Sequence, residues 1–116
     1  MKKILFAIFL TFLSSKSFSH DGNNGWVTIS NFDLWSNTYT EPQIRVNLNG
    51  DTYYNPAGIC SSVDSYMVST ALTEKQQDRI YSMLLAAVTA KKSLRVRLDT
   101  NYCENNRPRI LNVVIN

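Results

Sequence analysis

Hydrophobic residues recur at every second position in several segments of the chain, a spacing that predicts β-strands. The segment from Trp26 to Trp35 is rich in aromatic and β-branched residues. Its apolar positions change parity near Ser30 and Asn31, which predicts a β-bulge there. Alternation is regular in two later segments, Gln43 to Asn49 and Leu94 to Asp99. These patterns predict a mainly β protein.

Turn signals and shorter apolar segments complete the predicted sheet. Asn49-Gly50 is a strong hairpin signal, because both central residues of such a turn have positive φ. It predicts a return strand from Asp51 to Tyr54. The remaining expected elements are a turn at 55–58, a short strand at 65–70, a loop that holds Cys103, a turn at 105–108 and a last strand at 109–115.

One helix is predicted from Glu74 to Ala90. Thr73 and Gln76 have the spacing of a capping box, in which each side chain bonds the backbone N–H of the other residue. The apolar stripe of the helix consists of Ile80, Tyr81, Leu84, Leu85, Ala87 and Val88. A stripe this broad predicts a well-buried helix.

The order of these elements indicates a fold class. Five main strands with a helix between the third and the fourth is the connectivity of an OB-fold, a small Greek-key barrel. We therefore predict a mainly β, OB-fold-like barrel of five to six strands, with a buried helix before the last two strands. An open α+β sheet backed by one helix is the alternative.

The N-terminal residues have the pattern of a signal peptide. Two lysines precede an apolar run from Ile4 to Leu13, which is too short to span a bilayer as a helix. Small residues at the −3 and −1 positions predict cleavage near Ser19/His20. We expect a signal peptide at 1–19, one domain at 20–116, and a secreted or periplasmic protein without membrane insertion; a retained membrane anchor is the alternative.

Cleavage there would change the charge of the protein. The formal net charge of +3 comes from three lysines in the first 16 residues, and residues 20–116 hold nine bases and nine acids. The sequence pI near 9.0 is therefore no argument for a nucleic-acid partner, and we expect none. Residues 20–78 hold seven acids and two bases, and residues 79–116 hold two acids and seven bases. This asymmetry predicts either complementary faces between subunits or charges that folding interleaves.

The composition limits the chemistry of the protein. Exported proteins are oxidised, so we expect the two cysteines, Cys60 and Cys103, to form a disulfide that contributes roughly 3–4 kcal/mol. His20 is the single histidine, which excludes Ser/His and Cys/His catalysis and leaves a poor ligand set for zinc or copper. No glycine-rich phosphate loop is present. We therefore expect no enzyme, metal or cofactor.

Aromatic and amide side chains are candidates for sugar binding. Tyr39, Tyr53 and Tyr54 lie among asparagines in the first half of the chain, as does Trp35. Aromatic rings stack on the C–H faces of sugars, and amides bond their hydroxyls. The alternative is that these rings belong to the barrel core and to cross-strand pairs, which we favour for Trp26 and Trp35, whereas both interpretations stay open for Tyr39.

Four arginines in the second half form a basic patch: Arg95, Arg97, Arg107 and Arg109. Such a patch can hold anionic sugars or phosphates. A solvated strand face, or salt bridges to a neighbouring subunit, is the alternative that we favour.

The C-terminal part of the chain, Leu84 to Asn116, resembles the pentameric B subunits of bacterial AB toxins. The run CENNRPRILNVVIN is similar to one in the cholera and heat-labile enterotoxin B subunits. The subtilase-cytotoxin and pertussis-like B subunits share the order of strands, cysteine, helix, strand and cysteine. The resemblance implies an OB-type fold, a glycan receptor, a homo-pentamer and a toxin A subunit as partner.

Two residues correspond by motif to sugar contacts of that family, Asn106 and Arg107. The chain also departs from the enterotoxin pattern. Cys60 lies in mid-chain rather than near the mature N-terminus, and the sugar-stacking tryptophan beside the late cysteine is replaced by Glu104 and Asn105. The B-subunit resemblance therefore leaves most of the ligand site to be built from other residues.

The predicted function is an exported, non-enzymatic binding module, a glycan-binding component similar to a toxin B subunit. The candidate ligand-binding residues are Tyr39, Tyr53, Tyr54, Asn106 and Arg107. The alternative is a periplasmic accessory or inhibitor domain whose partner is another protein.

Overall fold

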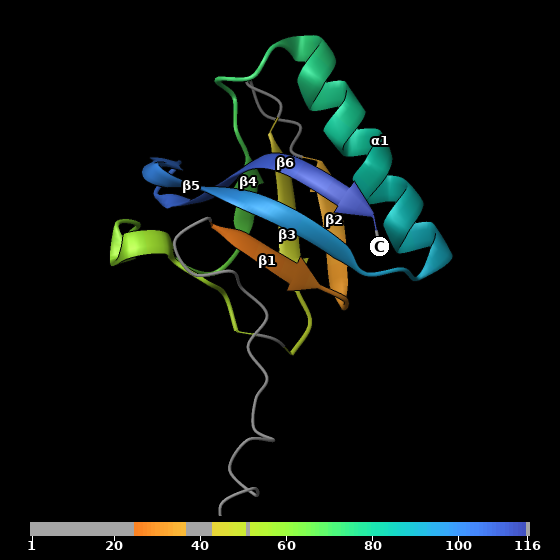
Figure 1. Ribbon diagram of the computed structural model, residues 1–116, viewed down its shortest axis with the longest axis horizontal. Coiled ribbons are helices and arrows are strands. Elements are labelled where there is room, and N and C mark those ends of the chain that lie inside the picture. The colour runs from red at the N-terminus through yellow and green to blue at the C-terminus, as the bar shows by residue number, and fades with distance from the viewer. Residues whose placement is uncertain (1–24, 37–42, 51, 116) are drawn as a thin grey trace, which may run out of the picture.

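A computed structural model describes residues 25–36, 43–50 and 52–115, which form one mixed six-stranded sheet and one long helix (Figure 1). The elements are β1 (Trp26–Ile29), β2 (Phe32–Ser36), β3 (Ile44–Leu48), the 3-10 helix η3 (Pro56–Gly58), β4 (Tyr66–Val68), α1 (Glu74–Ala90), β5 (Leu94–Glu104) and β6 (Arg107–Ile115). A mainly β chain with one helix before the last two strands is thus confirmed. The predicted signal peptide lies outside the described residues.

The strands follow the order β1-β5-β6-β4-β3-β2. All neighbours are antiparallel except β4 and β6, which are parallel. β1 and β2 lie at opposite edges of the sheet, although only Ser30 and Asn31 separate them. The parity change that predicted a bulge therefore marks the passage from one edge strand to the other.

This short link shapes the sheet. Three peptide steps reach at most about 11 Å, so the end of β1 and the start of β2 lie within that distance. The sheet must therefore curl until its two edges approach, and Figure 1 shows β1 running directly into β2. No ladder joins β1 to β2 in residues 25–36, so the described sheet is not closed into a barrel.

The core lies on the inner face of the curled sheet, and α1 packs against β6 and β2. Ile80, Leu84 and Ala87 are the buried residues of the helix. Tyr81 is half-buried and Leu85 is 47% exposed, so the buried stripe is narrower than predicted. The helix covers the sheet with one side only, which is why it is amphipathic rather than fully buried.

The start of α1 is capped as the sequence predicts. The Thr73 hydroxyl accepts a hydrogen bond from the Gln76 N–H at 3.1 Å, and the Gln76 amide oxygen accepts one from the Thr73 N–H at 2.9 Å. The helix ends at Ala90 and is followed by Lys91, whose backbone is left-handed with φ 56°. Both boundaries thus follow from local hydrogen bonding.

The hairpin predicted at Asn49-Gly50 is wrong. Residues 52–54 are not a strand, because both sides of β3 are already occupied by β2 and β4. Tyr53 and Tyr54 are instead partly buried against the core. The Leu48 N–H donates to the Tyr53 hydroxyl at 2.7 Å, and the backbone N–H of Tyr54 donates to the Tyr66 hydroxyl at 2.8 Å.

The two-residue hairpin of this protein lies between β5 and β6. Asn105 and Asn106 have φ of 53° and 68°, the left-handed conformation that this turn requires. The turn predicted at 105–108 is therefore confined to two residues. Cys103 lies in β5 and pairs with Pro108 of β6, so its predicted place in a loop is also wrong.

We expect Gly25→Ala to destabilise the protein more than Gly58→Ala. Both glycines have positive φ, which costs an alanine roughly 1–2 kcal/mol. A Cβ on Gly25 would also lie 2.3 Å from the backbone oxygen of Leu98, whereas one on Gly58 meets no atom within 4 Å. Urea unfolding measures both free energies, and equal losses would contradict the close packing at Gly25.

Candidate functional site

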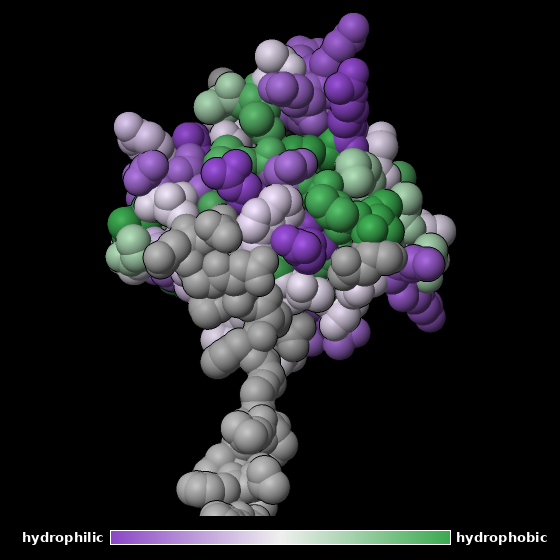
Figure 2. Space-filling view, in the orientation of Figure 1, coloured by the Kyte–Doolittle hydropathy of each residue, from purple (hydrophilic) through white to green (hydrophobic). Residues whose placement is uncertain are grey.

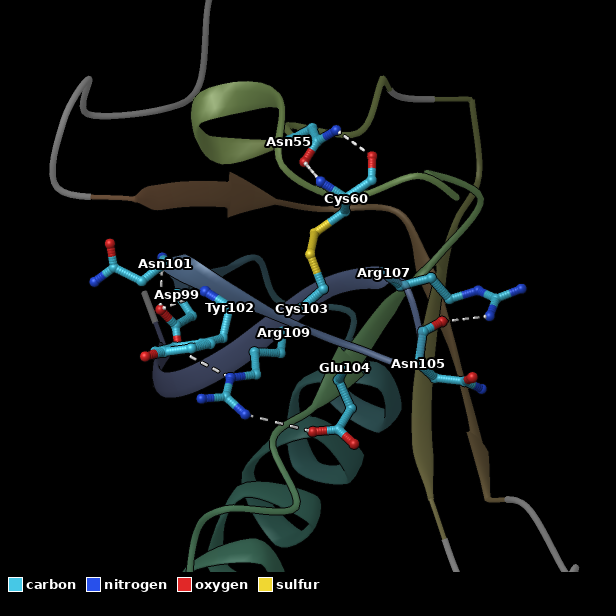
Figure 3. The surroundings of a disulfide bond; sticks show 10 residues. All are labelled: Asn55, Cys60, Asp99, Asn101, Tyr102, Cys103, Glu104, Asn105, Arg107 and Arg109. Carbon is cyan, nitrogen blue, oxygen red and sulfur yellow. Dashed lines mark hydrogen bonds and ion pairs between the residues drawn. A yellow bond between two sulfur atoms is a disulfide. The ribbon is translucent and has the colours of Figure 1, made fainter.

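A disulfide between Cys60 and Cys103 anchors the end of the β5–β6 hairpin, as the sequence predicts (Figure 3). It joins β5 to the segment between η3 and β4. The Asn55 side chain fixes Cys60 from the other side, because its amide donates to the Cys60 carbonyl at 2.9 Å and accepts from the Cys60 N–H at 3.1 Å. The hairpin end is thus tied to a rigid loop.

A large β-bulge distinguishes this end of the hairpin. Leu98 pairs with Ile110 and Cys103 pairs with Pro108, so four residues of β5, 99–102, face only Arg109 of β6. The predicted alternation of β5 ends at the residue where this bulge begins. A bulge changes the direction of side chains relative to the regular pleat, and Asp99, Asn101 and Tyr102 all lie within this one.

Asp99 organises the bulge. One of its carboxylate oxygens accepts the backbone N–H groups of Asn101 at 2.8 Å and Tyr102 at 3.2 Å, and the other accepts from Arg109 Nε at 2.8 Å. Burial alone would raise the pKa of Asp99, but these hydrogen bonds from the backbone and from Arg109 outweigh it. The pKa of Asp99 is therefore below its ordinary value, and the carboxylate is ionised.

Arg109 links the bulge to the neighbouring strand. Its Nη1 lies 3.8 Å from the Glu104 carboxylate, which accepts hydrogen bonds from the Thr70 N–H at 3.0 Å and from the Thr70 hydroxyl at 2.9 Å. The guanidinium also lies over the ring of Tyr102, 5.4 Å from its centroid. Tyr102 is 65% exposed, so a fixed cation supports a ring that faces solvent.

The hairpin turn is held by a second ion pair. Arg107 donates to both carboxylate oxygens of Asp64, at 2.7 and 3.2 Å, and to the Asn105 carbonyl at 2.9 Å. The hydrogen bond from Arg107 lowers the pKa of Asp64 to about 2. The Asn106 carbonyl accepts from the Ser62 N–H at 2.9 Å. The backbone of the turn is therefore fixed, while the side chains of Asn105 and Asn106 are exposed.

The structure brings together only part of the predicted site. Asn106 and Arg107 are neighbours at the hairpin turn. Tyr53 and Tyr54 are half-buried and pack against the core, where the Tyr53 ring meets that of Tyr66 edge-on at 5.0 Å. Tyr39 lies outside the described residues.

Sequence reasoning missed Asn101 and Tyr102. Both lie on the bulge, and their positions depend on the contact between Asp99 and Arg109. One local signal was present, because an aspartate followed by polar residues is typical of a turn in which the carboxylate accepts backbone N–H groups. That signal marks the turn but does not reveal that Tyr102 is exposed.

Comparison of the chain with protein-family models, with curated proteins and with solved structures finds no match. Within the described part of the chain, no helix is long and apolar enough to cross a membrane. The same residues contain no group of three His, Cys, Asp or Glu side chains that could hold a metal ion.

We expect Asp99→Asn to lower the free energy of unfolding by about 2 kcal/mol at neutral pH, because Arg109 loses a charged hydrogen-bond partner. The pKa of Asp99 is lower in the folded than in the unfolded state. Its contribution is therefore present above the unfolded value of 3.8 and is lost as the pH falls through the folded pKa. The free energies of unfolding of the variant and the wild type should therefore become more similar at acidic pH. Urea unfolding at neutral and at acidic pH measures both.

Asp64→Asn is the matched control. Its ion pair with Arg107 is screened by solvent, because the Asp64 side chain is 64% exposed, so we expect a loss of about 0–1 kcal/mol although the pKa of Asp64 is lowered to about 2. A difference between Asp99→Asn and wild type that stays constant across this pH range would contradict the role of the Asp99 charge.

Proposed function

We propose that this protein is an exported, non-enzymatic carbohydrate-binding module, and that the end of the β5–β6 hairpin is its sugar site. The observation that carries the proposal is the exposure of Tyr102 on a fixed support. An exposed aromatic ring held in one orientation is a suitable surface for the C–H face of a sugar to stack on. Here the bulge, the disulfide at Cys103 and the guanidinium of Arg109 hold the ring in place before any ligand binds.

The surrounding side chains suit a sugar. Asn101 adjoins Tyr102 on the bulge (Figure 3), and Asn105 and Asn106 lie at the hairpin turn. All three are exposed, and each amide can both donate to and accept from a hydroxyl group. A sugar stacks its C–H face on an aromatic ring while its hydroxyls bond such amides. Because the supporting backbone is fixed, little conformational entropy is lost on binding.

The order of elements supports an OB-type architecture. If β1 and β2 are counted as two parts of one bent first strand, α1 falls between the third and fourth of five strands. OB domains bind oligosaccharides with the loops between strands 1 and 2 and between strands 4 and 5. In this numbering the second loop is the turn at Asn105 and Asn106, and Tyr39, between β2 and β3 in the chain, lies outside the described residues.

The disulfide is consistent with an oxidising compartment outside the cytoplasm. A secreted or periplasmic location after cleavage near Ser19/His20, assembly into a homo-pentamer and a toxin A subunit as partner are the parts of the proposal that rest on the sequence and on its resemblance to toxin B subunits. Light scattering of residues 20–116 tests the assembly, for which a monomeric mass would exclude a ring.

We expect residues 20–116 to bind a defined subset of glycans on an array, and Tyr102→Ala to weaken that binding at least about tenfold. This loss corresponds to about 1.4 kcal/mol, the scale of one stacking contact. Tyr102→Phe keeps the ring and is expected to retain binding. Titration with the best array ligand measures all three proteins.

Trp35→Ala is the control for a general effect of aromatic surface, because Trp35 is 56% exposed on the edge strand β2. It is expected to bind as the wild type does. A blank array with folded wild-type protein would overturn the proposal. A single stoichiometric protein captured from periplasmic extract, together with that blank array, would favour the accessory or inhibitor domain instead.

A further inference from the structure

The outer face of the β1–β5–β6 part of the sheet carries a cluster that the proposed sugar site does not use. Two rows of cross-strand neighbours span the three strands: Trp26, Arg97 and Asn112 form one, and Thr28, Arg95 and Val114 form the other. We call these six residues the arginine face. The residues of alternate parity, such as Val27 and Val96, are buried, so the six point away from the core.

The structure divides the four arginines of the predicted basic patch. Arg107 and Arg109 form ion pairs with acidic residues of the same chain. Arg95 and Arg97 belong to the arginine face, which contains no acidic residue. Arg97 is exposed and forms no ion pair within the described residues. Figure 2 shows hydrophilic surface over the middle of β5 and β6, in the same orientation as Figure 1.

The indole of Trp26 holds one of these cations in place. The Arg95 guanidinium lies over the indole ring, 4.7 Å from its centroid. This contact limits the rotamers of Arg95 and covers one face of the indole. Trp26 is half-buried, whereas Tyr102 is 65% exposed, so the indole leaves less ring surface on which a nucleic-acid base could stack. The arginine face therefore offers guanidinium donors rather than an aromatic platform.

We propose that the arginine face is a second binding site, which takes the anionic groups of a sulfated or carboxylated polysaccharide. Guanidinium groups form bidentate hydrogen bonds with such oxyanions. Arg95 and Arg97 are two residues apart on one strand, a spacing of about 7 Å, so they suit a ligand with repeated anionic groups. Asn112 and Thr28 flank them with an amide and a hydroxyl for sugar hydroxyls.

The choice of a polysaccharide as the ligand rests on the proposed function, but the residues differ from those around Tyr102. The probe is dextran sulfate, with uncharged dextran as its control, titrated against residues 20–116 at low and at physiological salt. We expect binding to dextran sulfate that weakens with salt, because exposed charges are screened, and no binding to uncharged dextran.

Arg97→Gln is expected to weaken dextran sulfate binding about tenfold, and Arg95→Gln combined with Arg97→Gln to abolish it. The matched control is Arg79→Gln, because Arg79 is an exposed arginine on α1, away from the arginine face. It removes the same charge and is expected to bind as the wild type does. Urea unfolding confirms that each variant is folded before its affinity is compared.

The outcomes separate the two sites. Wild-type affinity of the double variant for dextran sulfate, or an equal loss in Arg79→Gln, would overturn the arginine face. Tighter binding of the wild type to single-stranded oligothymidylate than to dextran sulfate would overturn the choice of a polysaccharide. A blank glycan array with intact, Arg97-dependent binding of dextran sulfate would overturn only the site around Tyr102.

Discussion

The parallel pairing of β4 with β6 holds the two halves of the sheet together. On one side of this pair lie β1 and β5, and on the other lie β3 and β2. The pairing is short, with Met67 opposite Arg109 and Val68 opposite Ile110. Arg109 thus lies where the two halves meet. Its ion-pair partner Glu104 accepts two hydrogen bonds from Thr70, which follows β4, so polar contacts also cross the junction. The disulfide adds a covalent link close by.

The features that sequence reasoning predicted well depend on neighbours in the chain. The capping box at Thr73 and the apolar periodicity of α1 are local, and the observed helix has the predicted bounds. The disulfide followed from a count of two cysteines. The hairpin at Asn49-Gly50 was wrong because β2 and β4 already pair with both sides of β3, and no local pattern contains that information.

In the candidate site, too, sequence reasoning found the residues with a local motif and missed those whose positions depend on distant contacts. Asn106 and Arg107 were found through a motif in the sequence, and they lie at the hairpin turn. Tyr102 was missed because its exposure depends on a bulge, and the bulge depends on a hydrogen bond between Asp99 and a residue ten positions later. Charges behave likewise: Arg107 pairs with Asp64, so folding interleaves part of the predicted asymmetry between the two halves of the chain.

The pairing of β1 with β5 has a consequence for the order of folding. Trp26 lies opposite Arg97, so the first strand of the sheet has no partner until a strand more than two thirds of the way along the chain has been made. Contacts so distant in sequence form slowly, because a long loop must close first. A ribosome that releases this chain from its N-terminus therefore releases a polypeptide that cannot complete its sheet until synthesis is almost finished. Such a polypeptide stays unfolded during most of its synthesis. An unfolded chain can pass through a narrow secretion channel, as the proposed export route requires.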